Sequence, residues 1–259
     1  MKLSNILAVF RNDARVIRRV KWRLLEITFF PVTTILIWGM FALHSRQYAV
    51  EAGLIVLIVH LFWSFCQLAQ QQANILIMED LWSLSIKHVL ISGVSEFEYM
   101  IAKLCMSTTT AVCIGTILML IASAFGAPLL ANISVIVAMA GIALLGSIAL
   151  AVIIAGSVMV MGREYGFLSW SLLQVFIFFS APFFSPQIFP PYIRWITEFM
   201  PFTYVFQGAR AFATGAPITG SMLIHALLIT AIYFVLAWPY FFWAFRRTRK
   251  TGMLARIAH

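Results

Sequence analysis

The sequence contains few charged residues, few cysteines and no motif that binds nucleotides. Only 10% of its 259 residues are charged and 62% are hydrophobic, whereas soluble domains carry about 25% charged residues. The three cysteines lie in apolar stretches without the spacing of a zinc site or a disulfide framework. The chain also lacks the Gly-x-x-x-x-Gly-Lys-Ser/Thr loop that cradles phosphates. These absences argue against a soluble globule, a disulfide scaffold, a metal centre and an ATPase.

Long apolar stretches predict an all-α integral membrane protein. A bilayer core of about 30 Å needs about 20 apolar residues per helix. Six stretches reach this length, so we expect one membrane domain over residues 1–259 with six transmembrane helices. The expected spans lie near residues 25–43, 52–74, 100–125, 132–160, 167–185 and 222–245.

The net charge of +9 is explained better by membrane topology than by binding to nucleic acid. The basic residues gather at the two ends of the chain and beside the apolar runs. An even number of spans places both termini on one side of the membrane. If that side is the cytoplasm, fifteen basic residues lie inside and three outside. We therefore expect a multi-pass protein of the cytoplasmic membrane with both termini in the cytoplasm.

The first 23 residues predict an amphipathic helix that lies in the membrane interface. Its apolar side follows steps of three and four residues, and arginines occupy the flank beside it. The expected apolar stripe consists of Leu3, Leu7, Phe10, Ala14 and Ile17.

The segment 79–92 predicts a short cytoplasmic helix after the second span. Acidic residues stand in its first turn, Lys87 and His88 stand in its last turn, and Gly93 follows as a stop. Its apolar side includes Trp82, a residue type that is enriched at binding hot spots. A docking helix for a cytoplasmic partner and an interfacial helix anchored by Trp82 both explain these features.

Prolines interrupt the chain between the fifth and sixth expected spans. They predict a short hairpin over residues 186–213 that dips into the outer leaflet, with one helical stub on each side of Pro201. Irregular backbone at membrane depth needs hydrogen-bond partners from protein or from a water-filled cavity. The hairpin is therefore either a gate or an ordinary loop whose Tyr192 and Trp195 sit in the aromatic belt.

This order of elements resembles the membrane subunit of ABC-2 type exporters over essentially the whole chain. The most specific piece is Phe189 to Arg210, which is similar to the family's Leu-Pro-Pro, Asn-Pro and downstream Arg. The second piece is Glu79 to Ser95, which is similar to the family's acidic loop helix. The sequence departs from the family pattern at Gly93, where Pro is usual, and at Met78 and Met200, where Asn is usual.

The resemblance implies a permease that works with a separate ATPase. Two permease subunits would pair, as a homodimer in the simplest case, and two ABC ATPase subunits would carry ATP and Mg. This chain would bind no cofactor, catalyse no reaction, and contact membrane lipids but no nucleic acid. The resemblance favours docking for the 79–92 helix and implies ATPase-coupling roles for Glu79, Asp80, Leu81, Trp82, Ile86 and Lys87. It implies an outer gate built from Pro190, Pro191, Tyr192, Trp195, Pro201 and Arg210.

Polar and aromatic residues within the expected spans are candidates for a translocation path. Gln67, Gln71 and Asn74 share one face of the second span and either line the cytoplasmic mouth or bond to other helices. Phe179 and Phe183 belong to a phenylalanine-rich stretch that suits lipid tails and sugar rings as well as simple packing.

The sequence suggests more than one interaction for each of two further charged residues, Glu26 and Arg210. Glu26 stands beside Arg23 and near Lys21, which favours an interfacial ion pair over a proton relay. Arg210 either pairs with Glu198 or faces a cavity that would attract an anionic group.

Other function classes compete with the exporter. A secondary transporter would move substrate without an ATPase. A membrane cytochrome would use His60 and His225, but these histidines lie at different depths of their spans. A membrane enzyme would use Arg163 and Glu164. Because no segment resembles a soluble binding domain, we expect substrate recognition inside the membrane or on the cytoplasmic face. The resemblance to ABC-2 type exporters implies an amphipathic substrate such as a lipid-linked glycan, a lipid or a drug.

Overall fold

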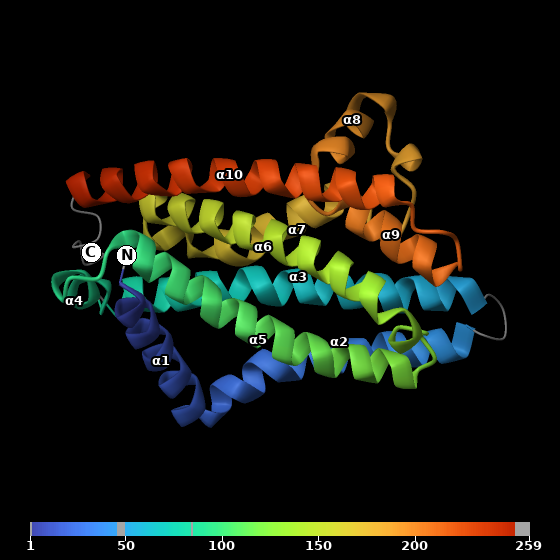
Figure 1. Cartoon of the computed structure of the whole chain (residues 1–259), viewed down its shortest axis with the longest axis horizontal. Helices are drawn as coiled ribbons and strands as arrows, with labels where there is room; N and C mark the ends of the chain where they lie inside the picture. Colours follow the sequence, from blue (N-terminus) through green and yellow to red (C-terminus); the bar gives the residue numbers. More distant parts are fainter. Residues whose placement is uncertain (1, 46–49, 84, 252–259) are drawn as a thin grey trace.

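The computed structural model describes residues 2–45, 50–83 and 85–251. The regular elements in these ranges are helices, which confirms the predicted all-α membrane fold (Figure 1). The α-helices are α1 (Leu3–Arg19), α2 (Lys21–Ser45), α3 (Val50–Trp82), α4 (Ser85–Ile91), α5 (Glu96–Ala124), α6 (Ile133–Met161), α7 (Leu168–Phe179), α8 (Pro191–Phe199), α9 (Thr203–Ala213) and α10 (Gly220–Thr251).

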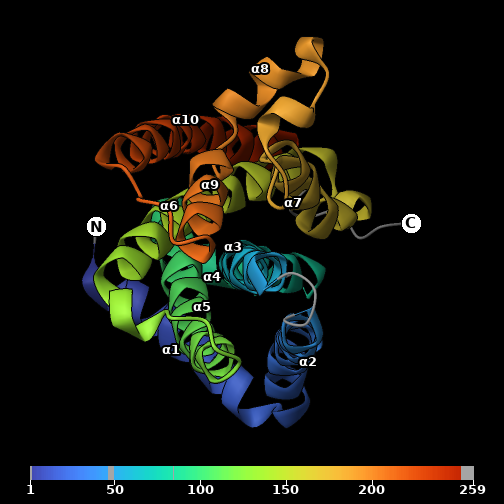
Figure 2. The same cartoon turned by 90° about the vertical axis from the view of Figure 1, so that its right-hand side faces the viewer.

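Five long helices form the bundle. The segments Trp22–Ser45, Glu51–Trp82, Glu96–Ala124, Leu130–Met161 and Gly220–Thr251 are each long and apolar enough to cross a membrane. They lie in α2, α3, α5, α6 and α10. The α3 and α6 spans are 56% buried inside the protein, whereas the α2 and α10 spans are only 17% buried. The centre of the bundle therefore lies along α3 and α6, and Figure 2 shows α2 at its periphery.

The expected span 167–185 differs from the other five. Its helix α7 has 12 residues, which corresponds to about 18 Å and is shorter than the bilayer core. The Ser180 hydroxyl donates back to the Phe176 carbonyl at 2.7 Å, Ala181 adopts a φ of 49°, and Pro182 follows. This backbone break ends α7, so the count of six spans stays a prediction.

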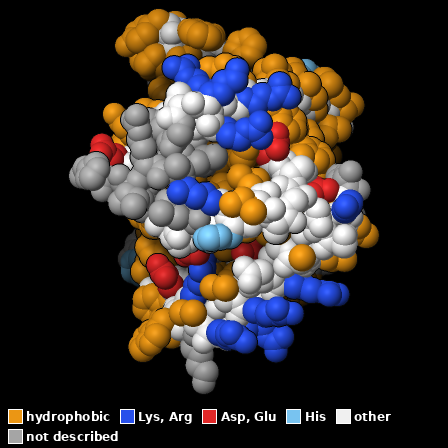
Figure 3. Space-filling view, turned by 90° about the vertical axis from the view of Figure 1, so that its left-hand side faces the viewer, with side chains coloured by type: hydrophobic (Ala, Val, Ile, Leu, Met, Phe, Trp, Pro, Cys, Tyr) orange, Lys and Arg blue, Asp and Glu red, His pale blue; other side chains and the backbone are white. Residues whose placement is uncertain are grey.

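One end of the bundle carries α1, α4 and the last turns of α10 (Figure 1). Exposed basic side chains gather at this end in two groups (Figure 3). One group belongs to α1 and the other to α10: Arg11, Arg15, Arg18, Arg19, Arg246, Arg247, Arg249 and Lys250. We call this end of the bundle the basic end.

Helix α1 packs through part of its predicted apolar stripe and through a neighbouring row of residues. Ile17 of the stripe is buried, and Phe10 and Ala14 pack against the same cluster, whereas Leu3 is 66% exposed. The other buried residues are Ile6, Val9 and Asp13, and α1 packs mainly against α5. The pattern did not predict the burial of Asp13, because the partner of this charged residue lies on another helix.

The helix predicted over residues 79–92 has different bounds in the structure. Helix α3 continues through Glu79 and Asp80 to Trp82, and the separate α4 begins only at Ser85. No Gly or Pro stands between Leu54 and Trp82 to end α3 earlier. The Ser83 hydroxyl then donates to the Glu79 carbonyl at 2.7 Å, which closes the last turn.

Helices α8 and α9 occupy the two stubs expected around Pro201. Helix α9 lies in the core, where Phe202 and Phe206 are fully buried. Helix α8 projects from the bundle beside α10 and α7 (Figures 1 and 2). A Cβ at Gly146 of α6 would lie 2.9 Å from Thr230 Cγ2 and 3.5 Å from Pro201 Cβ. The lack of a side chain at Gly146 therefore lets α6, α9 and α10 approach closely.

Candidate functional site: a polar groove beside a buried ion network

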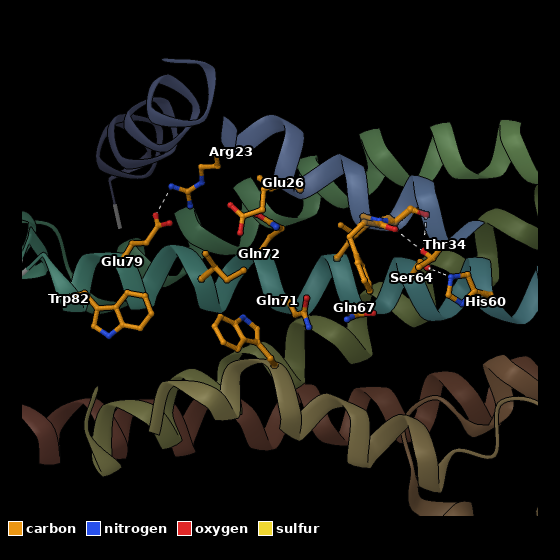
Figure 4. Close-up of a pocket in the computed structure, with 16 residues that line it drawn as sticks. Arg23, Glu26, Thr34, His60, Ser64, Gln67, Gln71, Gln72, Glu79 and Trp82 are labelled. Atoms are coloured by element: carbon orange, nitrogen blue, oxygen red, sulfur yellow. Dashed lines mark hydrogen bonds and ion pairs between the residues drawn. The ribbon is translucent and has the colours of Figure 1, made fainter. Parts of the chain in front are cut away.

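A groove of about 410 Å³ runs along α3. Helix α3 forms its floor and α2 forms one wall (Figure 4). Trp170 of α7 also lines the groove. Its polar lining residues are Arg23, Glu26 and Thr34 of α2 and His60, Ser64, Gln67, Gln71, Gln72 and Glu79 of α3. The α3 residues recur mainly at steps of three and four, so a single helical face supplies most of the floor.

Several groove side chains have hydrogen-bonding capacity that other protein groups do not use. Gln67 and Gln71 are half-buried and form no hydrogen bond with another described residue, and the buried Oε1 of Gln72 has no described partner. Ser64 Oγ and His60 Nε2 lie 3.2 Å apart. Because an amide carries two N–H donors and one acceptor oxygen, the groove can bind a ligand that both donates and accepts.

The charged residues of the groove gather at its end nearest Trp82 (Figure 4). Arg23 Nη1 lies 2.6 Å from Glu79 Oε2, which joins α2 to α3. Arg23 is therefore not the partner of Glu26, and the other expected partner, the Lys21 side chain, lies outside the described part of the structure. Glu26 is exposed and forms no ion pair with another described residue. The Arg23–Glu79 pair leaves the rest of the groove without a lysine or arginine among its described lining residues.

A buried ion network lies beside this end of the groove. Lys103 Nζ of α5 lies 2.9 Å from Asp13 Oδ1 of α1 and 2.7 Å from Asp80 Oδ2 of α3. The Tyr99 hydroxyl donates to Asp80 Oδ2 and the Ser85 hydroxyl to Asp80 Oδ1, each at 2.8 Å. Burial raises the pKa of Asp13, and the Lys103 ammonium opposes that rise. We call Asp13, Asp80, Tyr99 and Lys103 the ion network; it connects α1, α3 and α5, and the Ser85 hydrogen bond to Asp80 adds α4.

A second cavity of about 620 Å³ adjoins the ion network. Asp13, Asp80 and Lys103 line this cavity, which also shares three lining residues with the groove. The shared residues are Arg23, Glu79 and Trp82. The Arg23–Glu79 pair therefore lies where the two cavities meet.

The structure separates the six predicted coupling residues into inward and outward groups. Asp80 belongs to the ion network, Glu79 pairs with Arg23, and Leu81 and Ile86 are buried. Trp82 is 47% exposed, and Lys87 is half-buried. The acidic pair that resembled a helix start thus holds helices together, and the exposed surface at the α3–α4 junction includes Trp82, His88 and Ile91.

Only two of the five predicted path residues line the groove. Gln67 and Gln71 lie in the groove, whereas Asn74 is fully buried outside the groove lining, with no described partner for its amide. Phe179 packs against Phe189, and the Phe183 ring lies 5.7 Å from the Trp63 ring, so neither phenylalanine lines the groove. The sequence analysis missed the groove residues Thr34, His60, Ser64, Gln72 and Trp170. Helical steps backward from Gln67 would have identified Ser64 and His60.

The predicted gate residues lie mostly on α8. Tyr192 is 74% exposed and Trp195 is 59% exposed. Pro190 and Pro191 begin this helix and are exposed, whereas Pro201 is buried at the turn into α9.

Arg210 has a partner that the sequence analysis did not consider. Its guanidinium donates to the carbonyls of Ala181 and Pro182, the latter at 2.8 Å. Arg210 therefore stabilises the backbone break after α7, instead of pairing with Glu198 or standing free in a cavity.

The two histidines considered as metal ligands lie in separate surroundings. His60 belongs to the groove, whereas the His225 ring stacks on Tyr204 at 5.5 Å. Among the described residues there is no group of three or more His, Cys, Asp or Glu that could hold a metal ion.

The family comparison identifies the type of membrane protein. The family model described as ABC-2 type transporter matches residues 5–214, from within α1 to just past the end of α9. The chain belongs to the ABC-2 type transporter family. No curated protein matches it. This ABC-2 type permease is a multi-pass membrane protein, and permeases of this family generally work with an ABC ATPase. Its polar groove is a candidate binding site for a substrate. The exposed end of α3 at Trp82 is a candidate contact surface for a partner.

Proposed function

We propose that this ABC-2 permease is the membrane subunit of an ATP-driven exporter that moves an amphipathic substrate out of the cytoplasm. The family match over residues 5–214 supports the proposal, and the groove supplies a polar route beside apolar, exposed α2. Because the sequence has no phosphate-binding loop, ATP and Mg belong to two copies of a partner ATPase.

The basic end of the bundle is the cytoplasmic side in this proposal. Its exposed arginines on α1 and α10 follow the positive-inside rule. A thiol introduced by Ala216→Cys, in the loop before α10, should react with a membrane-impermeant reagent from outside, and one introduced by Arg249→Cys should not. The opposite labelling pattern would reverse the orientation.

The exposed Trp82 at the α3–α4 junction is the proposed ATPase contact. Loss of a large indole anchor from an interface costs about 2 kcal/mol or more, so Trp82→Ala should stop an ABC ATPase from co-purifying with the tagged chain. Trp243→Ala is a matched control, because Trp243 is 49% exposed and lies on α10. Normal co-purification and transport with Trp82→Ala would contradict this assignment, and transport without any ATPase would indicate a secondary transporter.

Two copies of the chain form the export path in this proposal. One groove open along its side does not enclose a passage, and a two-fold partner would cover it. The exposed aromatic residues of α8 would then lie near the two-fold axis and close the outer mouth at rest. A disulfide cross-link between two copies carrying Trp195→Cys should form in the resting state and block export. A monomer in lipid nanodiscs would disprove the pairing.

A further inference from the structure

The middle of the groove is polar but uncharged. Gln67, Gln71 and Ser64 line it, whereas Arg23, Glu26 and Glu79 gather at one end (Figure 4). A charged group at membrane depth is costly unless an opposite charge accompanies it. Within the described lining, the middle of the groove offers no such charge. Passage along it is therefore easiest for a group without charge.

The groove amides are arranged to bind such a group. Gln67 and Gln71 have no hydrogen-bond partner among the described residues. Gln72 also lines the groove, but it is only 5% exposed and its Oε1 is buried without a described partner. The half-buried amides of Gln67 and Gln71 are the ones that a ligand can reach, and hydrogen bonds to them would replace those lost when the ligand leaves water. Hydroxyl and amide groups both donate and accept, so they match these side chains.

The rim of the groove is apolar. Phe30 of α2 is 63% exposed, and Trp170 of α7 is 51% exposed. Aromatic faces bind the apolar side of a ring or chain. Exposed Phe29 and Ile37 continue this apolar surface along α2. A molecule with a polar head and an apolar tail would thus find both surfaces next to each other.

We propose that the groove binds the uncharged, hydroxyl-rich head of a membrane amphiphile and disfavours anionic heads. This inference rests on the proposed function, because the groove is then part of the export path. Gln67 and Gln71 are the specificity-determining residues, since they bind hydroxyls directly. Arg23, the single Lys or Arg in the described lining, is paired with Glu79, and Glu26 repels phosphate-bearing heads at the entrance.

A protection experiment tests the preference for the head directly. The chain in lipid nanodiscs would carry Thr34→Cys, which places a thiol in the groove lining and keeps Gln67 and Gln71, with the exposed Cys105 and Cys113 replaced by Ser and the buried Cys66 kept. A polar maleimide labels the new thiol in the presence of one of three probes with the same dodecyl tail: dodecyl maltoside, dodecyl phosphate or dodecyltrimethylammonium. We expect dodecyl maltoside to slow labelling about fivefold, which is the effect of one or two hydrogen bonds between its hydroxyls and the groove amides. The two charged probes should slow labelling less than about twofold.

Two controls separate binding from general effects of the probes. A thiol at exposed position 88, introduced by His88→Cys, should label at the same rate with every probe. In the labelling background, Gln71→Leu should abolish most of the protection, whereas Gln71→Asn, which keeps an amide, should retain it. Because Arg23 Nη2 has no described partner, equal protection by dodecyl phosphate is the result that would overturn the proposal. Absence of protection by dodecyl maltoside, or full protection in Gln71→Leu, would also overturn it.

The experiment is independent of the ATPase. Head-selective protection without ATP-dependent transport would refute the exporter and leave the head preference intact. ATP-dependent transport with equal protection by all three probes would refute the head preference and leave the exporter intact.

Discussion

The groove and the ion network are two polar regions on the same helix, and they use their polar groups in opposite ways. In the ion network, Asp80 accepts from Lys103, Tyr99 and Ser85, and Asp13 Oδ1 accepts from Lys103, so all carboxylate oxygens but the buried Asp13 Oδ2 have a protein partner. In the groove, Gln67 and Gln71 have no described protein partner. The first arrangement holds helices in place, and the second is available to a ligand. Polar residues of a membrane helix therefore cannot be assigned to transport from residue type alone.

The largest effect on stability is expected from Lys103→Met. This change leaves Asp13 and Asp80 facing each other in a buried site, and breaking a buried ion pair from one side costs about 3–5 kcal/mol. Thermal unfolding of the purified chain should show a clearly lower midpoint. Lys250→Met, at an exposed position, should change the stability by less than about 0.5 kcal/mol. Equal midpoints for the two variants would show that the ion network is not structural.

Arg210→Met should have the next largest effect. It leaves the carbonyls of Ala181 and Pro182 without their donor, at a cost of about 1–3 kcal/mol. The loss is local, so hydrogen exchange should rise in residues 176–190 and change little in α3 and α5. Uniformly faster exchange throughout the chain would contradict this local role.

The Arg23–Glu79 pair should contribute about 1 kcal/mol or less, because Glu79 is 41% exposed. A double-mutant cycle with Arg23→Met and Glu79→Gln measures this coupling energy. A coupling larger than that of Lys103 with Asp13 would reverse the ranking of the two ion pairs.

The smallest effect on stability is expected from Gln71→Leu, less than about 0.5 kcal/mol, because this amide has no described partner to lose. The same substitution should reduce export in reconstituted vesicles about fivefold if the groove binds substrate through one hydrogen bond at this position. A large loss of thermal stability would place Gln71 with the structural residues instead.

Local signals in the sequence predicted the parts of the fold that depend on local chemistry. Apolar length predicted the long helices, and the prolines around Pro201 predicted α8 and α9, because proline ends a helix wherever it stands. The partners of Asp13 and Arg210 were not predictable in this way. Lys103 lies 90 residues after Asp13 in the sequence, and no local pattern reports a contact over that distance.

The coupling segment shows why a local signal can also mislead. Acidic residues favour the start of a helix, so Glu79 and Asp80 suggested that a helix begins there. Both carboxylates instead face cations from α2 and α5, inside a helix that is already formed. For the groove, the sequence predicted Gln67 and Gln71 from their spacing, but Trp170 joins them only through the packing of α7 against α3.

Helix α3 extends without interruption over 33 residues, from Val50 through the groove floor to the exposed Trp82. A straight helix of this length is a rod of about 50 Å. Asp80 connects this rod to α4 and α5, whereas α2 is held at this end by the weaker Arg23–Glu79 pair. If an ATPase docks here as proposed, a push on α4 would tilt the rod together with α5 more readily than α2. A tilt of only about 5° would displace the far end of the rod by about 4 Å. The displacement of the groove floor by such a tilt would therefore increase along α3 with distance from Trp82.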